Sequence, residues 1–170
     1  MTKPLVISGY ALCWNERACI HNDQERFYEQ FLPGAFADSI QRRNQTVRYC
    51  HMRSLDFASA ETGQLTLFED EKGLSFRIEL ENNHENRLLY NLVRDGQICH
   101  VSVGFKNAEF KETKRGRRSF RLIKRAELVE ISIVENPAYK TSIVQVGCNN
   151  RRLELISNID KALLKEDVNK

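Results

Sequence analysis

The chain has 170 residues, of which 41% are hydrophobic and 29% charged, and its formal net charge is +3. This composition is typical of one globular domain, which buries roughly 70% of its unfolded-chain surface and needs no disulfide or metal for stability. The charge is too small to indicate nucleic-acid binding, and no apolar run approaches the ~18 residues of a membrane span. We therefore expect a soluble cytoplasmic protein without a signal peptide.

The five cysteines are odd in number and form no Cys-x-x-Cys pair. Neither a disulfide framework nor a zinc ribbon is therefore expected. Two dipeptides, Cys50-His51 and Cys99-His100, resemble metal-binding pairs. Neighbouring residues of a strand point to opposite faces, so neither pair can hold one ion unless a bulge intervenes. We predict no metal and no organic cofactor.

The first third of the chain alternates apolar segments with turns such as Pro33-Gly34. A short helix is predicted after this turn because Phe36 and Ile40 are four residues apart on one helical face. In chain order we expect a strand over residues 5–14, a polar loop over 16–25, this helix over 35–43 and a further strand over 46–52. Residues 27–32 lead into the turn and are given no element.

The clearest strand covers residues 74–81, where apolar and polar residues alternate without exception. A short strand over 65–68 precedes it. A helix follows, with Asn82 or Asn83 as its N-cap and Gly96 at its C-terminal end. The apolar stripe expected to face the core comprises Leu88, Leu89, Leu92 and Val93.

The next part of the chain is rich in β-branched residues and is predicted to form strands. The basic run 114–118 has no aromatic residues among its charges, so we interpret it as a solvated hairpin tip and not as a nucleic-acid contact. Strands are expected over residues 98–105, 110–113, 119–124, 128–134 and 143–146.

Together these elements predict an α+β domain dominated by strands, with a curled antiparallel sheet or barrel flanked by helices. The domain is expected to cover residues 1–147. From residue 151 onward, apolar residues recur every three or four positions, which predicts a C-terminal helical tail over 148–170.

Ser102 is a candidate nucleophile on the strand 98–105. One face of this strand is apolar, and Ser102 projects from the other face on a rigid element. Gly104, two residues on, has no side chain and would let a substrate backbone approach. The alternative is a serine on a half-exposed strand that simply contacts water.

A serine nucleophile needs a base, and the chain has four histidines. His51 ends a predicted strand and can meet Ser102 across the sheet. His100 shares the face of Ser102, but a Cα separation of about 6.6 Å along a strand is long for a direct hydrogen bond. His21 lies in a polar loop and His84 at a helix start, so both are expected to be solvated.

Glu130 is the candidate acidic partner, because it lies among β-branched residues on the strand 128–134. A carboxylate buried there needs a partner, and an imidazole is a suitable one. The alternatives are a charge on an edge strand that opposes aggregation, and Glu135 as the acid, although Glu135 borders an exposed turn. On the face of Glu130 we expect Ser132, Leu128 and Val134.

Four ordered stretches, over residues 8–36, 51–74, 93–105 and 128–139, carry a family likeness. The most specific pieces are Ser-x-Gly-Phe from Ser102 and Glu-x-Ser-x-Val-x-x-Pro-Ala from Glu130. With them, residues 5–146 resemble the prohead protease family of tailed bacteriophages, the phage relatives of the herpesvirus assemblins.

The resemblance implies an assemblin-like fold and a serine endopeptidase that acts by acyl transfer. It implies Ser102 as nucleophile, His51 as base and Glu130 as acid, with no cofactor. The implied substrate is the scaffolding part of the capsid protein, cut inside an assembling prohead in the bacterial host cytoplasm, and the protease is expected to cleave itself. Neither a membrane nor a specific nucleic acid is an expected partner, and a homo-oligomer is left open.

Two alternatives remain at this stage. Residues 52–58 depart from the family pattern, in which an acidic residue and a Pro-Leu-Gly-like turn follow the histidine. The chain could therefore be a non-catalytic capsid-assembly scaffold or an inactive protease homologue. A cysteine hydrolase using Cys50 or Cys99 is disfavoured, because Cys99 falls on the apolar face and a reactive thiolate needs an accessible, electropositive niche.

Overall fold

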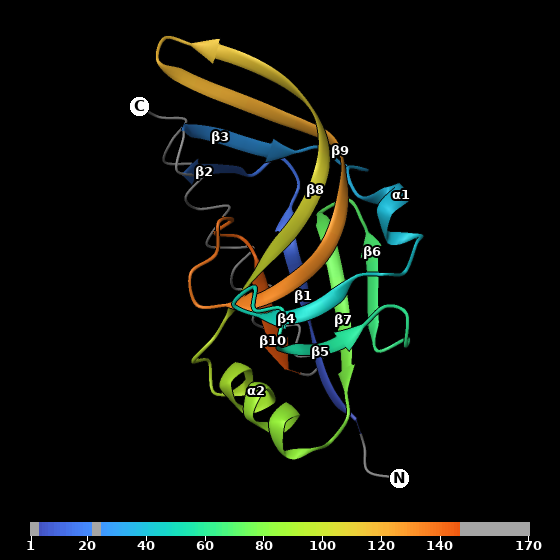
Figure 1. Ribbon diagram of the computed structural model, residues 1–170. Coiled ribbons are helices and arrows are strands. Elements are labelled where there is room, and N and C mark those ends of the chain that lie inside the picture. The colour runs from blue at the N-terminus through green and yellow to red at the C-terminus, as the bar shows by residue number, and fades with distance from the viewer. Residues whose placement is uncertain (1–3, 22–24, 147–170) are drawn as a thin grey trace.

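The computed structural model describes residues 4–21 and 25–146. Strands dominate this part of the chain, and two helices lie at its periphery (Figure 1). None of the described helices is long and apolar enough to cross a membrane. The predicted helical tail over 148–170, and the domain boundary before it, lie outside the described residues.

The described residues form ten strands and two helices. In chain order they are β1 (Leu5–Cys13), β2 (Arg17–His21), β3 (Arg26–Phe31), α1 (Ala37–Ile40), β4 (Thr46–Tyr49), β5 (Asp56–Ser59), β6 (Leu65–Glu69), β7 (Gly73–Leu80), α2 (His84–Arg94), β8 (His100–Arg115), β9 (Arg118–Val134) and β10 (Ile143–Val146).

The strands form two sheets. The first is antiparallel, in the order β10-β1-β7-β6. The second is built on β9, which has β8 along one edge and both β3 and β4 along the other, followed outward by β2 and β5. The α+β class dominated by strands is thus confirmed.

The arrangement differs from the predicted antiparallel sheet or barrel in two ways. Strands β3 and β4 run parallel to β9, because the segment between them carries α1 and returns the chain in the same direction. The two sheets do not close into a barrel. Instead, β9 is long enough to pair with β3 near its start and with β4 near its end.

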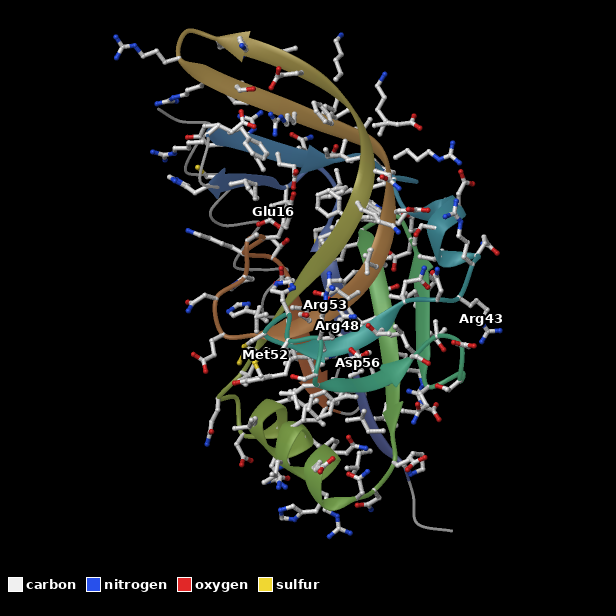
Figure 2. The ribbon with its side chains drawn as sticks, viewed as in Figure 1. Glu16, Arg43, Arg48, Met52, Arg53 and Asp56 are labelled. Carbon is white, nitrogen blue, oxygen red and sulfur yellow. The ribbon has the colours of Figure 1, made fainter. Side chains whose placement is uncertain are left out.

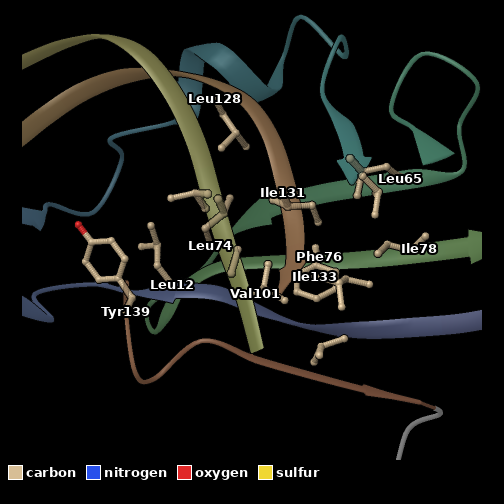
Figure 3. Close-up of a cluster of buried hydrophobic side chains, with 14 of the residues drawn as sticks. Leu12, Leu65, Leu74, Phe76, Ile78, Val101, Leu128, Ile131, Ile133 and Tyr139 are labelled. Carbon is tan, nitrogen blue, oxygen red and sulfur yellow. The ribbon is translucent and has the colours of Figure 1, made fainter. Parts of the chain in front are cut away.

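The main core lies between the two sheets (Figure 3). Each fully buried aliphatic or aromatic side chain contributes roughly 1.5–3 kcal/mol. This packing fixes one face of β9 toward the interior, through Ile131 and Ile133. The alternate residues of β9 are therefore turned to the opposite face. The labelled core comprises Leu12, Leu65, Leu74, Phe76, Ile78, Val101, Leu128, Ile131, Ile133 and Tyr139.

Strands β8 and β9 form one long hairpin, and its far half, where β9 pairs with β3, projects beyond the first sheet as an arm (Figure 1). Arg115 pairs with Arg118 at its tip, and Gly116 between them has a φ of 60°. The exposed basic tip is as predicted. The separate short strands predicted here are wrong, because β-bulges interrupt the alternation without ending the strands.

The short strands β2, β3 and β5 were not predicted. β2 lies within the segment predicted as a polar loop, and it pairs with β3 while burying Ala18. β5 pairs with β4 along its outer edge. The capping of α2 was predicted correctly: Asn83 accepts a hydrogen bond from the Asn86 backbone N–H at 2.8 Å, and Gly96 has a φ of 72°.

Candidate active site

Three neighbouring strands, β4, β9 and β8, place polar residues on one face of the second sheet. Paired residues of adjacent strands point to the same face. Ser132 on β9 is paired with Arg48 on one side and with Ser102 on the other. Because Ile131 and Ile133 face the core, the polar face lies opposite. It carries Thr46, Arg48, Ser102, Gly104, Glu130 and Ser132.

The structure brings His51 and Glu130 together. The His51 Nδ1 atom lies 2.6 Å from Glu130 Oε1. The carboxylate is only 5% exposed, whereas the imidazole is 47% exposed. With Nδ1 held by the carboxylate, Nε2 is left to exchange a proton with a substrate or nucleophile, the arrangement a serine hydrolase requires of its base.

A strained turn directs His51 toward Glu130. β4 ends at Tyr49, and the next two residues, Cys50 and His51, have φ values of 48° and 61°. Left-handed backbone costs about 1–3 kcal/mol for a non-glycine residue unless its surroundings hold it. Here the backbone N–H of Cys50 donates to the Ile133 carbonyl at 3.1 Å, and that of Met52 to the Tyr49 carbonyl at 3.0 Å.

Ser132 links the strained turn to the carboxylate. Its hydroxyl accepts a hydrogen bond from the His51 backbone N–H at 3.2 Å and donates to Glu130 Oε1 at 3.3 Å. Ser132 is fully buried. The alternation on the strand predicted that Ser132 shares a face with Glu130, but gave it no role, because its contact with His51 depends on the register of β4.

Arg48 occupies the other side of the Glu130 carboxylate. Its Nη1 binds Glu130 Oε2, and its Nε donates to Asp56 Oδ1 at 2.7 Å. The hydrogen bond to Asp56, followed by the nearby carboxylate charges, raises the pKa of Arg48 above its ordinary value. A permanently charged guanidinium offsets the cost of burying a carboxylate. Neither Arg48 nor Asp56 was predicted from the sequence as part of the site.

Gly104 makes room for Glu130. A Cβ atom at Gly104 would lie 2.6 Å from Glu130 Cγ and 2.9 Å from its Oε1, closer than side chains tolerate. The expectation that this glycine lets a substrate backbone approach is therefore wrong, because the acid occupies the space. The predicted face of Leu128 is also wrong. A bulge next to Glu130 turns Leu128 to the other face of β9, where it pairs with Phe105 and is buried in the core.

Ser102 lies on the same face, one strand away from Ser132, and is half-buried. Directly paired residues of antiparallel strands have Cα atoms about 4.5–5.5 Å apart. Within the described residues, no hydrogen bond joins the Ser102 hydroxyl to His51 or Glu130. The structure thus brings two of the three predicted residues into contact and places the third on the adjoining strand.

The other candidates lie apart from this contact. His100 Nδ1 is 3.0 Å from the Ser142 carbonyl, a contact that ties the start of β8 to the segment before β10. His84 begins α2, and Glu135 is exposed after β9. The Cys99 thiol donates to the Gly96 carbonyl at 3.2 Å. Residues 4–21 and 25–146 contain no cluster of three or more His, Cys, Asp or Glu side chains able to hold a metal.

Comparison with known protein families identifies a relationship over most of the chain. The profile of the family described as caudovirus prohead serine protease matches residues 2–157, which is most of the chain. No curated protein matches the chain. The further relation to the herpesvirus assemblins stays a prediction.

Proposed function

Because the chain belongs to the caudovirus prohead serine protease family, we propose that it cleaves the scaffolding part of the capsid protein, and itself, inside the assembling prohead. Family membership supports a serine protease of phage capsid maturation. The finer points are our proposal: the substrate segment, self-cleavage and action within the bacterial host cytoplasm.

In the proposed mechanism, the Ser102 hydroxyl attacks the scissile carbonyl while His51 Nε2 takes its proton. His51 then protonates the leaving amine as the C–N bond breaks and an ester to Ser102 remains. Water, deprotonated by His51, hydrolyses this ester and releases the second product. Glu130 holds the imidazole through Nδ1 and stabilises the positive charge that forms on it.

The observation that carries this proposal is the 2.6 Å contact between His51 Nδ1 and Glu130 Oε1, on a face that also holds Ser102. The buried carboxylate needs a partner, and that partner is a half-exposed imidazole whose other nitrogen is accessible to a substrate. Catalytic hydrogen bonds in uncomplexed enzymes are often long and tighten only with substrate. The separation of Ser102 from His51 is therefore compatible with the mechanism.

A non-catalytic scaffold or inactive homologue is the second candidate. One observation favours it: within the described part of the chain, the Ser102 hydroxyl has no hydrogen bond to His51. The experiment below separates the two.

Co-expression of the full chain with its capsid-protein precursor tests the function, with product masses as the measurement. We expect capsid and protease fragments in the wild type and none in Ser102→Ala or His51→Ala. Ser119→Ala on the arm and His84→Ala at the start of α2 are matched controls that should cleave normally. Fragments that persist in Ser102→Ala would show that another residue is the nucleophile. Intact precursors in every sample, together with no labelling of Ser102 by a fluorophosphonate, would favour the scaffold.

A further inference from the structure

A groove of about 600 Å³ runs between α2 and the turn that follows His51. One wall is formed by residues 54–57 and the other by the first turns of α2. Figure 2 shows Arg48, Met52 and Asp56 gathered at this end of β4, with α2 below them. The contact between His51 and Glu130 lies outside the residues that line this groove.

The groove has exposed aliphatic side chains on both walls. Leu55 is 38% exposed on the turn, and Leu88 is 55% exposed on α2. Leu88 belongs to the stripe predicted to pack against the core, but it faces solvent instead. Exposed apolar side chains that cluster mark a binding surface more often than those scattered singly. Three of the five large hydrophobic side chains exposed in the described residues lie on these walls or the adjoining turn: Met52, Leu55 and Leu88.

The rim of the groove is acidic. Glu81 and Glu85 line it, and within the described residues neither forms an ion pair with a basic side chain. Asp56 also lines it, but its charge is matched by Arg48. Unmatched carboxylates beside an apolar surface favour a partner that carries a positive charge next to an apolar group.

The groove is continuous with the candidate active site. Asp56 lines the groove and accepts the hydrogen bond from Arg48, which in turn binds Glu130. Tyr49 also lines it and precedes His51 by two residues. A polypeptide held at His51 would therefore have its neighbouring residues over this groove.

We propose that the groove is a substrate-selecting subsite, which binds a bulky aliphatic side chain of the polypeptide substrate with a lysine or arginine next to it. This inference rests on the proposed function and adds the chemistry of the preferred sequence. The leucines hold the aliphatic side chain, and Glu81 and Glu85 hold the cation. Discrimination of about tenfold is expected for one aliphatic side chain in such a pocket.

The test uses the full chain and a library of synthetic peptides that presents every residue type at each position, with cleaved products identified by mass spectrometry. Wild type should enrich Leu, Ile or Met at one position relative to the cut. Leu88→Ser should reduce kcat/KM for those peptides by about tenfold and leave peptides with a small residue there unchanged. Phe68→Ser, which removes a similarly exposed side chain outside the groove (49% exposed), is the matched control and should cleave as wild type.

The rim is tested separately with the double variant Glu81→Gln/Glu85→Gln. Its preference for Lys or Arg beside the aliphatic residue should fall by about threefold, as expected for exposed ion pairs. Thermal unfolding followed by circular dichroism checks that each variant is folded.

The outcomes separate this inference from the proposed function. One outcome would overturn the subsite but not the proposed protease function. In it, a fluorophosphonate labels Ser102 in the wild type, and the aliphatic preference is unaffected by Leu88→Ser and Leu55→Ser. If Leu88→Ser accelerates cleavage of all peptides alike, the groove is covered by the chain itself and the subsite is wrong. If library cleavage is undetectable but Ser102 is labelled, the labelling rates of peptidyl phosphonates with and without leucine are compared. Faster labelling by the leucine phosphonate would support the subsite, and equal rates would overturn it. A chain that neither cleaves nor reacts would overturn both proposals.

Discussion

The two ends of the β8–β9 hairpin contrast sharply. At one end, Glu130 is buried, and its two carboxylate oxygens contact His51, Ser132 and Arg48. At the other end, the tip over residues 114–118 is exposed and basic, and farther along the hairpin Arg125 pairs with Asp38 through side chains that are both more than half exposed. The same pair of strands therefore carries a buried polar cluster at Glu130, whose partners are fixed by packing, and exposed ion pairs whose side chains can be replaced with little effect. Burial of the polar groups, more than the strand pairing itself, decides where a substitution matters.

The largest effect is expected for Glu130→Gln. The amide keeps the size of the side chain but cannot stabilise an imidazolium, so kcat for cleavage of the capsid precursor should fall by about 10³- to 10⁴-fold. The rate is measured by following fragment formation in time. A fall of less than tenfold would show that Glu130 has no catalytic part. Glu112→Gln on the arm is the matched control and should cleave at the wild-type rate.

Gly104→Ala should come next. Its Cβ would meet Glu130 Cγ at 2.6 Å, so the carboxylate must shift from His51. Overpacking of this kind costs about 1–3 kcal/mol of stability, and a displacement near 1 Å can cost about 10²-fold in rate. Chemical denaturation and the cleavage assay measure the two effects. The comparison is Gly116→Asn at the arm tip, where no atom lies near and asparagine accepts the positive φ. Equal losses of stability and rate at both glycines would contradict the contrast between the buried cluster at Glu130 and the exposed arm tip.

Glu29 provides a smaller, pH-dependent test at the buried junction where β3 joins the arm. It is paired with Arg121 across the sheet, is buried, and accepts a hydrogen bond from the Tyr139 hydroxyl at 2.7 Å. Burial raises the pKa of Glu29, although the Tyr139 hydrogen bond and Arg121 oppose the rise. Its contribution to stability is therefore present below the ordinary carboxyl pKa of about 4.3 and is lost as pH rises through the higher folded-state value.

Glu29→Gln removes this loss and keeps an acceptor for Tyr139. We expect the variant to unfold at a temperature about 2–4 °C higher than wild type at neutral pH, with a smaller difference at acidic pH. Melting curves at both pH values measure this. A variant less stable than wild type at neutral pH would mean that the carboxylate charge itself stabilises the fold.

The smallest effect is expected for Arg125→Gln. Its guanidinium lies 2.5 Å from the Asp38 carboxylate, but both side chains are more than half exposed. Exposed pairs contribute little, so stability should change by less than about 0.5 kcal/mol, as measured by denaturant midpoints. A loss above about 1 kcal/mol, twice the expected ceiling, would show that this pair stabilises the fold.

Local patterns predicted much of the fold but little of its pairing. The alternation over residues 74–81 and the caps of α2 are local signals, and both are present in the structure. The parallel pairing of β4 with β9 is not a local property. It alone places Arg48 against Glu130, which explains why the sequence analysis missed this residue. The bulge beside Glu130 similarly changed the face of Leu128, because an inserted residue reverses the alternation.

The same limit applies within the site. His51 and Glu130 were predicted from residue type, strand position and family likeness, and their contact is present. The role of Ser132 required the backbone of a strained turn, and that of Gly104 required the cross-strand register. A single sequence carries no direct signal for either. The part of Ser102 as nucleophile stays a prediction.

The fit between Gly104 and Glu130 couples two sequence positions that lie far apart along the chain. In a relative, a larger residue at the first position would require a shorter acid, such as aspartate, at the second. Positions 104 and 130 should therefore covary among homologues. The small residue two places after the serine would then be conserved because it makes room for the acid on the neighbouring strand.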